Sequence, residues 1–195
     1  PAAIPKTLTL GFSTLQELKI KINKSTDTEM FKLKLGSVND EQIIKTYCET
    51  TSIPFAVDVN QGWRDIDYAK NITDLLTEKG ALFIEQPFEK KDLKKHELLK
   101  THTITPIIAD ESLQTLDDLA SIQESFDGIN IKLMKCGGIH PAIKLMNEAK
   151  KRNLSILVGC MSGGLFEHEG STILANQSNW LDLDGLLLND LCELD

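Results

Sequence analysis

The sequence predicts an α/β fold, a closed (β/α)8-type TIM barrel that forms one domain. Short apolar runs alternate with segments of helical spacing, and such alternation implies a parallel sheet. Runs such as 106–109 (PIIA) and 155–158 (SILV) are apolar on both faces, as expected when helices cover the sheet. Eight such runs favour a closed barrel over an open sheet. The predicted strands are 6–12, 30–36, 55–60, 81–88, 105–112, 128–134, 154–161 and 180–188.

The first predicted strand argues against the open alternative. A doubly wound sheet usually carries a glycine-rich phosphate loop after its first strand, and LGFSTLQ (10–16) is not one. Barrels of this type need about 250 residues, or about 200 at the low end. At 195 residues the chain is near that minimum, so we expect residues 1–195 to form a single barrel domain.

Helix signals fill the intervals between the predicted strands. Capping residues precede several segments, and basic residues close others, as the helix dipole favours. The segment 163–179, before the last strand, is weak as a helix. The predicted helices are 41–50 after Asp40, 66–80 after Asp65, 116–125 after Thr115 and 142–153 after Pro141.

Composition narrows the function classes. Hydrophobic residues make up 41% and charged residues 26%, as in an ordinary globular protein. A net charge of -8 argues against a nucleic-acid partner, and no apolar stretch approaches the roughly 20 residues that span a bilayer, so we expect no membrane partner. Four cysteines without a CxxC pair favour a reduced, cytoplasmic setting. A homo-oligomer stays among the expectations, because barrels of this class often associate.

Five charged residues lie at the ends of five successive predicted strands. In a barrel of this type the active site lies at the carboxyl ends of the strands, so these side chains are expected to converge on one mouth. The five are Lys34, Asp58, Glu85, Asp110 and Lys132.

The three carboxylates predict a metal site. Like charges in one mouth repel and raise one another's pKa unless a cation is present. Because no His or Cys accompanies Asp58, Glu85 and Asp110, all-oxygen ligation favours Mg2+, with Mn2+ as a further option.

The lysines predict proton transfer. Lys34 follows Lys32 by two residues, so both point to the same side of the strand, and a neighbouring cation lowers a lysine's pKa enough for it to accept a proton. Lys132 ends a strand further round the barrel, although Lys135 could also be the reactive lysine there. One lysine would remove a proton next to a carboxylate and the other would return one to the opposite face.

As a set, these motifs resemble the enolase superfamily in its muconate-lactonizing subgroup, most closely the dipeptide epimerases. FKLKLG is similar to the subgroup's Lys-x-Lys motif, DVNQGW, IEQP and ADES to its three metal-ligand motifs, and IKLMKCGGI to its sixth-strand motif. The resemblance implies a modified (β/α)7β barrel with catalytic Lys34 and Lys132 and Mg2+ ligands Asp58, Glu85 and Asp110. Lys32 would contact substrate, and Asn60 and Glu111 would contact the catalytic lysines or the metal ligands and orient them.

The last predicted strand points to a substrate. WLDLDG places Asp182 and Asp184 on the same side of the strand. In dipeptide epimerases a similar Asp-x-Asp pair binds the α-ammonium group of the dipeptide. We therefore expect Mg2+-dependent epimerisation of a dipeptide by two-lysine 1,1-proton transfer through a metal-stabilised enolate.

Two departures keep alternatives open. Family members carry a separate α+β capping domain before the barrel, which these residues do not form, so the chain is expected to be a barrel alone or a fragment of a longer enzyme. Gly163 and Gly164 stand where the subgroup usually has an acidic residue. The alternatives are a cycloisomerase, an o-succinylbenzoate synthase, or a non-catalytic truncated barrel.

Overall fold

A computed structural model describes residues 7–25, 27–161 and 165–185, and its strands confirm the predicted barrel. The eight strands are hydrogen-bonded in the order β1 to β8, and each neighbouring pair is parallel. The strands are β1 (Thr7–Leu10), β2 (Met30–Lys34), β3 (Phe55–Asp58), β4 (Ile84–Glu85), β5 (Ile107–Ala109), β6 (Gly128–Lys132), β7 (Ser155–Gly159) and β8 (Trp180–Asp182).

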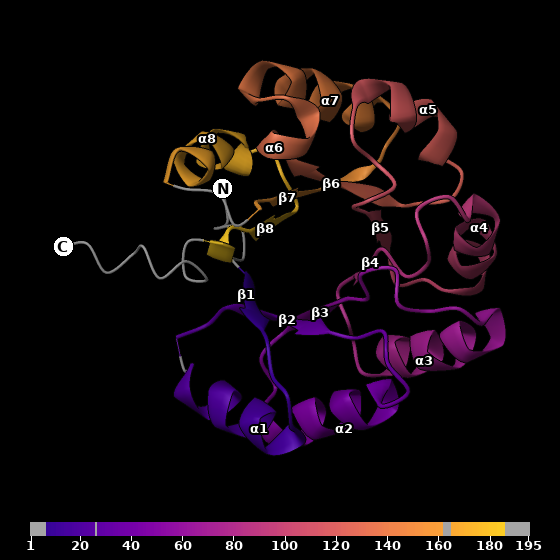
Figure 1. Cartoon of the computed structure of the whole chain (residues 1–195), viewed down its shortest axis with the longest axis vertical. Coiled ribbons are helices and arrows are strands. Elements are labelled where there is room, and N and C mark those ends of the chain that lie inside the picture. Colours follow the sequence, from indigo (N-terminus) through magenta and orange to yellow (C-terminus); the bar gives the residue numbers. More distant parts are fainter. Residues whose placement is uncertain (1–6, 26, 162–164, 186–195) are drawn as a thin grey trace.

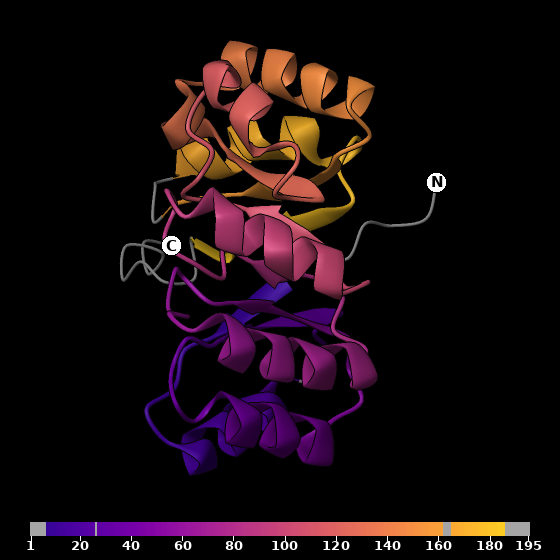
Figure 2. The same cartoon turned by 90° about the vertical axis from the view of Figure 1, so that its right-hand side faces the viewer.

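Helices follow the strands and form an outer ring around them (Figure 1). Figure 2 shows these helices stacked along the outside of the sheet. No helix in the described part of the chain is both long and apolar enough to cross a membrane. The helices are α1 (Leu15–Lys24), α2 (Asp40–Thr50), α3 (Ile66–Glu78), α4 (Leu93–His102), η1 (Leu116–Asp118), α5 (Leu119–Ile122), α6 (Leu133–Cys136), α7 (Ile139–Lys151) and α8 (Leu165–Ala175).

Side-chain caps begin several of these helices. Asp65 accepts a hydrogen bond from the backbone N–H of Tyr68 at 2.7 Å, as its position before α3 predicts. Gly80 follows α3 with φ of 77°, the left-handed conformation that ends helices. Asp40 was expected just before its helix; it is instead the first residue of α2, and its side chain accepts hydrogen bonds from the preceding loop.

The strands separate two apolar regions. The larger fills the space between sheet and helices, and a smaller one contains Met30, Ala56, Phe83, Ile108 and Leu157. Because side chains alternate across a strand, the residues two further along each of these strands lie on the same, inner face. The smaller cluster therefore forms an apolar floor beneath the polar residues of the mouth.

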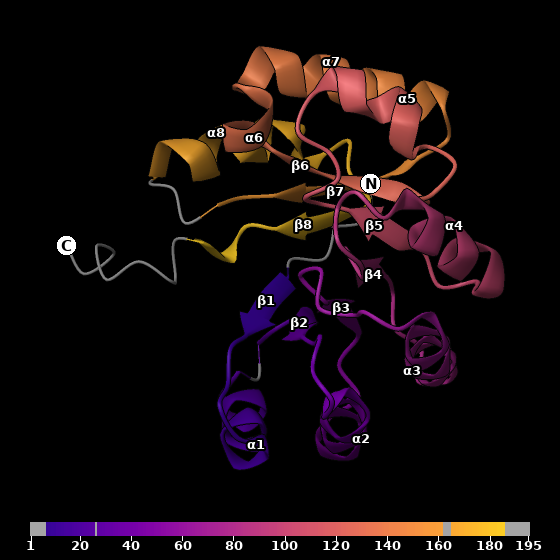
Figure 3. The same cartoon turned by 45° about the vertical axis from the view of Figure 1, so that its right-hand side comes forward.

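The last strand meets the first through side chains. Figure 3 shows β8 between β7 and β1. The Thr7 hydroxyl donates to Asp182 Oδ1 at 2.6 Å, and the Thr9 N–H donates to Asp184 Oδ2 at 2.6 Å. Asp182 in β8 and Asp184 just after it thus help to close the barrel.

Two predicted segments differ from the structure. The segment 163–179, weak as a helix by sequence, contains α8. Its Gly170 allows the helix to approach α6, because a Cβ at this position would lie 2.8 Å from Leu133 Cδ1. The predicted last strand is shorter than expected, since β8 ends at Asp182; residues 186–188 of that prediction lie outside the described residues.

Candidate active site at the barrel mouth

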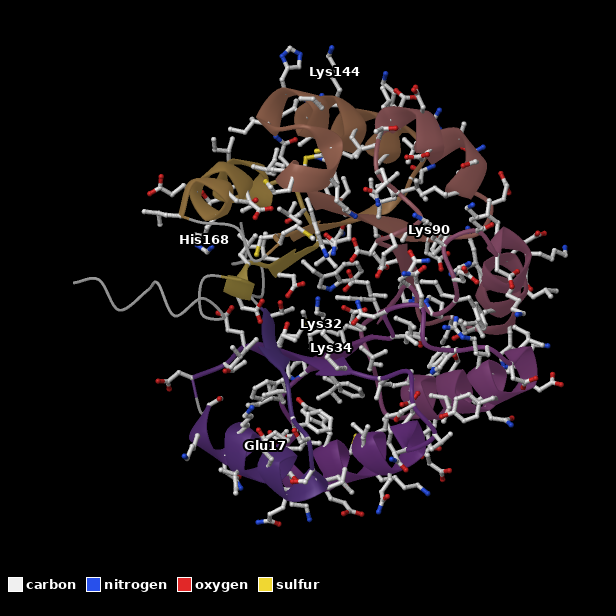
Figure 4. The ribbon with its side chains drawn as sticks, in the orientation of Figure 1. Glu17, Lys32, Lys34, Lys90, Lys144 and His168 are labelled. Carbon is white, nitrogen blue, oxygen red and sulfur yellow. The ribbon has the colours of Figure 1, made fainter. Side chains whose placement is uncertain are left out.

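The sheet register brings the predicted residues to one end of the barrel. Lys34 is paired with Asp58, and Asp58 with Glu85, on adjacent strands. Across the barrel, Lys132 is paired with Gly159, which is paired with Asp182. Parallel strands end on the same side, so these side chains share the mouth. Figure 4 shows Lys32 and Lys34 inside the ring of strands, whereas Glu17 and Lys144 lie on the surrounding helices α1 and α7.

Lys32 is the most buried of the mouth lysines, with only 3% of its surface exposed. Its Nζ is 3.1 Å from Glu85 Oε2 and 3.7 Å from Asp58 Oδ2, and it also pairs with Asp182. Burial opposes the charge on Lys32, but these three carboxylates outweigh it and raise the pKa of the ammonium well above its usual value. Lys32 is therefore a buried cation that ties β2 to β3, β4 and β8.

Lys34 lies at the open side of the mouth. Its Nζ is 2.8 Å from Asp58 Oδ2 and 2.8 Å from Asn60 Oδ1, while 42% of its side chain stays exposed. Asn60 also donates its backbone N–H to Asp58 Oδ1 at 3.0 Å and has a left-handed φ of 46°. The predicted supporting residue Asn60 thus contacts both members of the Lys34–Asp58 pair.

Lys132 lies across the barrel in a more closed setting. Its Nζ donates to Asp110 Oδ2 at 2.7 Å and its side chain is 12% exposed. Burial lowers its tendency to ionise, but Asp110 and Glu85 outweigh this and raise the pKa of Lys132. In this state Lys132 is a paired ammonium group.

Lys135, the alternative lysine, holds the same carboxylate from the other side. Its Nζ donates to Asp110 Oδ1 at 2.5 Å, to the Asp110 carbonyl at 2.8 Å and to the Asn130 carbonyl at 3.1 Å. Burial, only partly offset by Asp110, lowers the pKa of Lys135. Burial would raise the pKa of Asp110, but Lys135 and Lys132 outweigh it and hold that pKa well below its usual range.

Glu85 occupies the centre of the three predicted ligands and is fully buried. Burial raises its pKa to about 8; Lys32 opposes the shift, and Asp58 and Asp110 add to it. Asn130 donates to Glu85 Oε1 at 2.6 Å, while the amide oxygen Oδ1 of Asn130 is buried without a hydrogen-bond partner in the described part of the chain. The sequence analysis missed Asn130, which gives no signal within its strand.

The three carboxylates are suitable ligands for a hard divalent cation. Asp58, Glu85 and Asp110 offer carboxylate oxygens from three adjacent strand ends, and repulsion from Asp58 and Asp110 adds to the burial that raises the pKa of Glu85. Among residues 7–25, 27–161 and 165–185, however, no three acidic, His or Cys side chains are gathered as a metal site. Lysine ammonium groups supply the positive charge instead, so an ion would have to displace them from the oxygens that they hold.

Asp182 in β8 and Asp184 just after it already accept hydrogen bonds. Asp182 directs Oδ1 to Thr7 and Oδ2 to Lys32. Burial would raise the pKa of Asp182, but Lys32 and Thr7 outweigh it and lower that pKa. Asp184 accepts the Thr9 N–H through Oδ2. Among the residues that the structure describes, Asp184 accepts through Oδ2, so its Oδ1 is the freer acceptor of the pair there.

Two further carboxylates lie near the mouth. Glu111, predicted to orient the site, has a buried Oε2 without a partner in the described residues, and burial and Asp110 raise its pKa. Glu167, from α8, accepts the Met161 N–H at 3.1 Å at the exit of β7. Sequence analysis missed Glu167, because it lies in the segment that was weak as a helix.

Comparisons with known proteins show the family to which the chain belongs. The family described as Enolase C-terminal domain-like matches residues 17–178. The L-Ala-D/L-Glu epimerase of Bacteroides thetaiotaomicron is 38% identical over 183 residues, which are 93% of this chain and 48% of that protein. The chain thus spans about half the length of this curated relative.

Solved structures show the same barrel. The substrate-liganded L-Ala-D/L-Glu epimerase of Bacillus subtilis superposes with a TM-score of 0.88 at 25% identity, covering 96% of this chain and 56% of that one. A dipeptide epimerase of Enterococcus faecalis, complexed with Mg and L-Leu-L-Tyr, has a TM-score of 0.85 at 27% identity and covers 94% and 55%.

Proposed function

The chain belongs to the Enolase C-terminal domain-like family, and from this premise we propose that its barrel carries the proton-transfer site of a dipeptide epimerase. The observation that carries the proposal is the placement of Lys34 and Lys132. These lysines end β2 and β6, four strands apart in an eight-stranded ring, with three carboxylates between them. Two amine bases on opposite sides of one mouth suit removal of an α-proton from one face and its return to the other.

The matched relatives limit what the barrel supplies. Because the chain spans about half of their length, the proposal concerns the part of the site that residues 1–195 contribute as one barrel domain. Relatives are named for epimerase activity on dipeptides. For this chain, that activity is proposed from the positions of the lysines and the carboxylates.

Asp58, Glu85 and Asp110 would hold Mg2+. When bound, Mg2+ would bind the substrate carboxylate and offset the negative charge that develops as the α-proton leaves. Lys32 would stay beneath the site, since its buried Nζ also pairs with Asp182, and would contact the substrate from below. Asn60 would keep Lys34 directed into the mouth through its 2.8 Å contact with Nζ.

The substrate ammonium group would lie beside β8. Asp184 would accept it through Oδ1, while Asp182, already paired with Lys32, would add negative charge nearby. A carboxylate pair attracts an ammonium group and repels a second carboxylate.

One observation favours a second candidate, a cycloisomerase or o-succinylbenzoate synthase. Both oxygens of Asp182 are engaged, by Thr7 and Lys32, which suits a substrate without an ammonium group. An Asp184→Asn variant separates the two candidates: it would lower turnover of a dipeptide strongly and leave turnover of a substrate that lacks the ammonium group nearly unchanged.

A dipeptide panel in D2O tests the proposal. Protein is incubated with L,L-dipeptides and Mg2+, with a chelator control, and followed by proton NMR. We expect Mg2+-dependent loss of an α-proton signal and appearance of a second diastereomer. Absence of both for every dipeptide tried would contradict the proposal.

A further inference from the structure

Asp40 is a fully buried carboxylate outside the mouth. It is 0% exposed, and its side chain accepts hydrogen bonds from neutral donors. The Gly36 N–H lies 3.0 Å from both oxygens, the Ser37 N–H 2.9 Å from Oδ1 and the Ser37 hydroxyl 3.2 Å from Oδ1. A buried charge is costly unless such donors compensate for it, so the arrangement of these donors around Asp40 is tightly constrained.

The same carboxylate also binds the neighbouring loop. Trp63 Nε1 donates to Asp40 Oδ2 at 2.7 Å, and Trp63 is itself buried in the turn that follows β3. Asp40 therefore joins two segments, the β2 exit loop (residues 35–39) and the β3 exit loop (residues 59–63).

The two loops are in backbone contact where Asp40 joins them. A Cβ at Gly62 would lie 2.5 Å from Gly36 Cα, and a Cβ at Gly36 would lie 2.7 Å from the Val59 carbonyl oxygen. Gly36 has φ of 105°, in the left-handed region that favours glycine. Both positions exclude a side chain, so the two loops approach this closely only because glycine occupies both positions.

This joint lies directly behind Lys34. Lys34 precedes the β2 exit loop by one residue, and Asn60, which binds Lys34 Nζ at 2.8 Å, belongs to the β3 exit loop. Asn60 and Gln61 have left-handed φ values of 46° and 63°, a conformation that is uncommon outside glycine, although Asn adopts it more readily than Gln.

We infer that Asp40 is a positioning residue that sets Lys34 against Asp58 and Asn60 by locking the two exit loops together. The inference rests on the proposed function of the mouth. Asp40 acts through backbone geometry, and its effect is confined to the Lys34 side, because its contacts do not reach β5 or β6.

The kinetic test resolves the two sides of the reaction. The α-proton exchange of the L,L- and L,D-forms of L-Ala-Glu is measured separately in D2O with Mg2+, and the Lys34→Ala variant identifies the diastereomer that Lys34 deprotonates. Asp40→Asn replaces one carboxylate oxygen with an amide NH2 group, which cannot accept a hydrogen bond from the backbone N–H groups that it would face. We expect this variant to slow exchange of that diastereomer by on the order of 10- to 100-fold. Exchange of the other diastereomer should change by less than about threefold, since the Lys132 side keeps its geometry.

A matched control is Asp118→Asn. Asp118 also accepts two backbone N–H groups, those of Gln114 and Thr115, at a more exposed helix start after β5. The variant therefore removes a carboxylate cap away from Lys34. It should leave both exchange rates unchanged. Equal slowing of both diastereomers by Asp40→Asn, or no slowing at all, would overturn the inference.

Hydrogen–deuterium exchange of the backbone tests the joint without relying on turnover. Trp63→Phe removes the indole donor and keeps an aromatic ring, so it serves if Asp40→Asn does not fold. It should increase deuterium uptake in residues 35–39, in the opposite loop, by several-fold, and leave residues 111–118 unchanged. If residues 35–39 stay as protected as in the wild type, the joint is not what holds them and the inference fails. If the wild type exchanges no dipeptide proton while Trp63→Phe still increases deuterium uptake in residues 35–39, the proposed function is refuted and the joint stands.

Discussion

The two lysine-bearing sides of the mouth are built differently. On the Lys34 side, the base is 42% exposed, and its geometry depends on Asn60 and on the loops that Asp40 joins. On the Lys132 side, the base is 12% exposed, and a second ammonium group, that of Lys135, binds the carboxylate of Asp110 that Lys132 also binds. One base is thus positioned by backbone geometry and the other by buried charge. The two sides should respond to different perturbations.

The largest expected effect comes from removing the cation beneath both sides. Lys32→Met would leave Glu85, Asp58 and Asp182 without their shared ammonium group. Breaking a buried ion pair by removing one partner costs about 3–5 kcal/mol, and we expect the upper end, about 5 kcal/mol, in the free energy of unfolding. Urea denaturation measures this. A loss below about 1 kcal/mol would mean that Lys32 does not neutralise these carboxylates.

The next effect compares the sides directly. Lys135→Met leaves Asp110 with one ammonium partner in a buried setting and should cost about 3 kcal/mol of unfolding free energy. Lys34→Met removes a half-exposed pair and should cost less than about 1 kcal/mol. Equal losses in urea denaturation would contradict the distinction between a charge-held and a backbone-held side.

Acid should loosen the Lys132 side through His96. His96 is buried; its Nε2 lies 3.3 Å from Gln86 Nε2 and accepts the Phe88 N–H at 3.3 Å, and Gln86 Oε1 in turn accepts the Asp110 N–H at 2.9 Å. Burial lowers the pKa of His96 from 6.5 to about 4.

The direction of the pH effect follows from that lowered pKa. Between pH 6.5 and 4 the unfolded chain binds a proton that folded His96 does not, so its stabilising contribution is full above pH 6.5 and falls as pH decreases. At pH 5 the loss is about 2 kcal/mol. His96→Gln should flatten this part of the stability–pH curve. An unchanged slope in His96→Gln would refute the assignment.

The structure shows which parts of this account the sequence could predict. Strand–helix alternation and strand-end charges predicted the barrel and the gathering of Lys34, Asp58, Glu85, Asp110 and Lys132, because period-two alternation and parallel strand ends are local properties. Their roles in binding and catalysis stay predictions.

Other contacts depend on distance in space rather than on local pattern. Thr7 meets Asp182 only because the barrel closes, and Asp40 meets Trp63 only because two loops pack together. α8 was missed because its stability comes from packing, as Gly170 against Leu133 illustrates. Lys34 was expected beside a second cation, Lys32; what the sequence did not predict is that both lysines contact the same carboxylate, Asp58.

Mg2+ should have a smaller effect on stability that depends on both sides. A ligand of the folded state adds RT ln(1 + [L]/Kd), about 1.4 kcal/mol at ten times its Kd. We expect the melting temperature to rise with Mg2+ and to fall again with a chelator. Asp58→Asn on one side and Asp110→Asn on the other should each abolish the rise, while Asp118→Asn should retain it. A rise that survives both ligand variants would place the ion elsewhere.

The most direct test of the two-sided mouth is diastereomer-resolved α-proton exchange in Lys34→Ala and Lys132→Ala. With L,L- and L,D-Ala-Glu in D2O and Mg2+, each variant should lose exchange of one diastereomer, a different one in each case, and neither should epimerise. Loss of the same diastereomer in both variants, or normal epimerisation in either, would contradict the assignment of one base to each side.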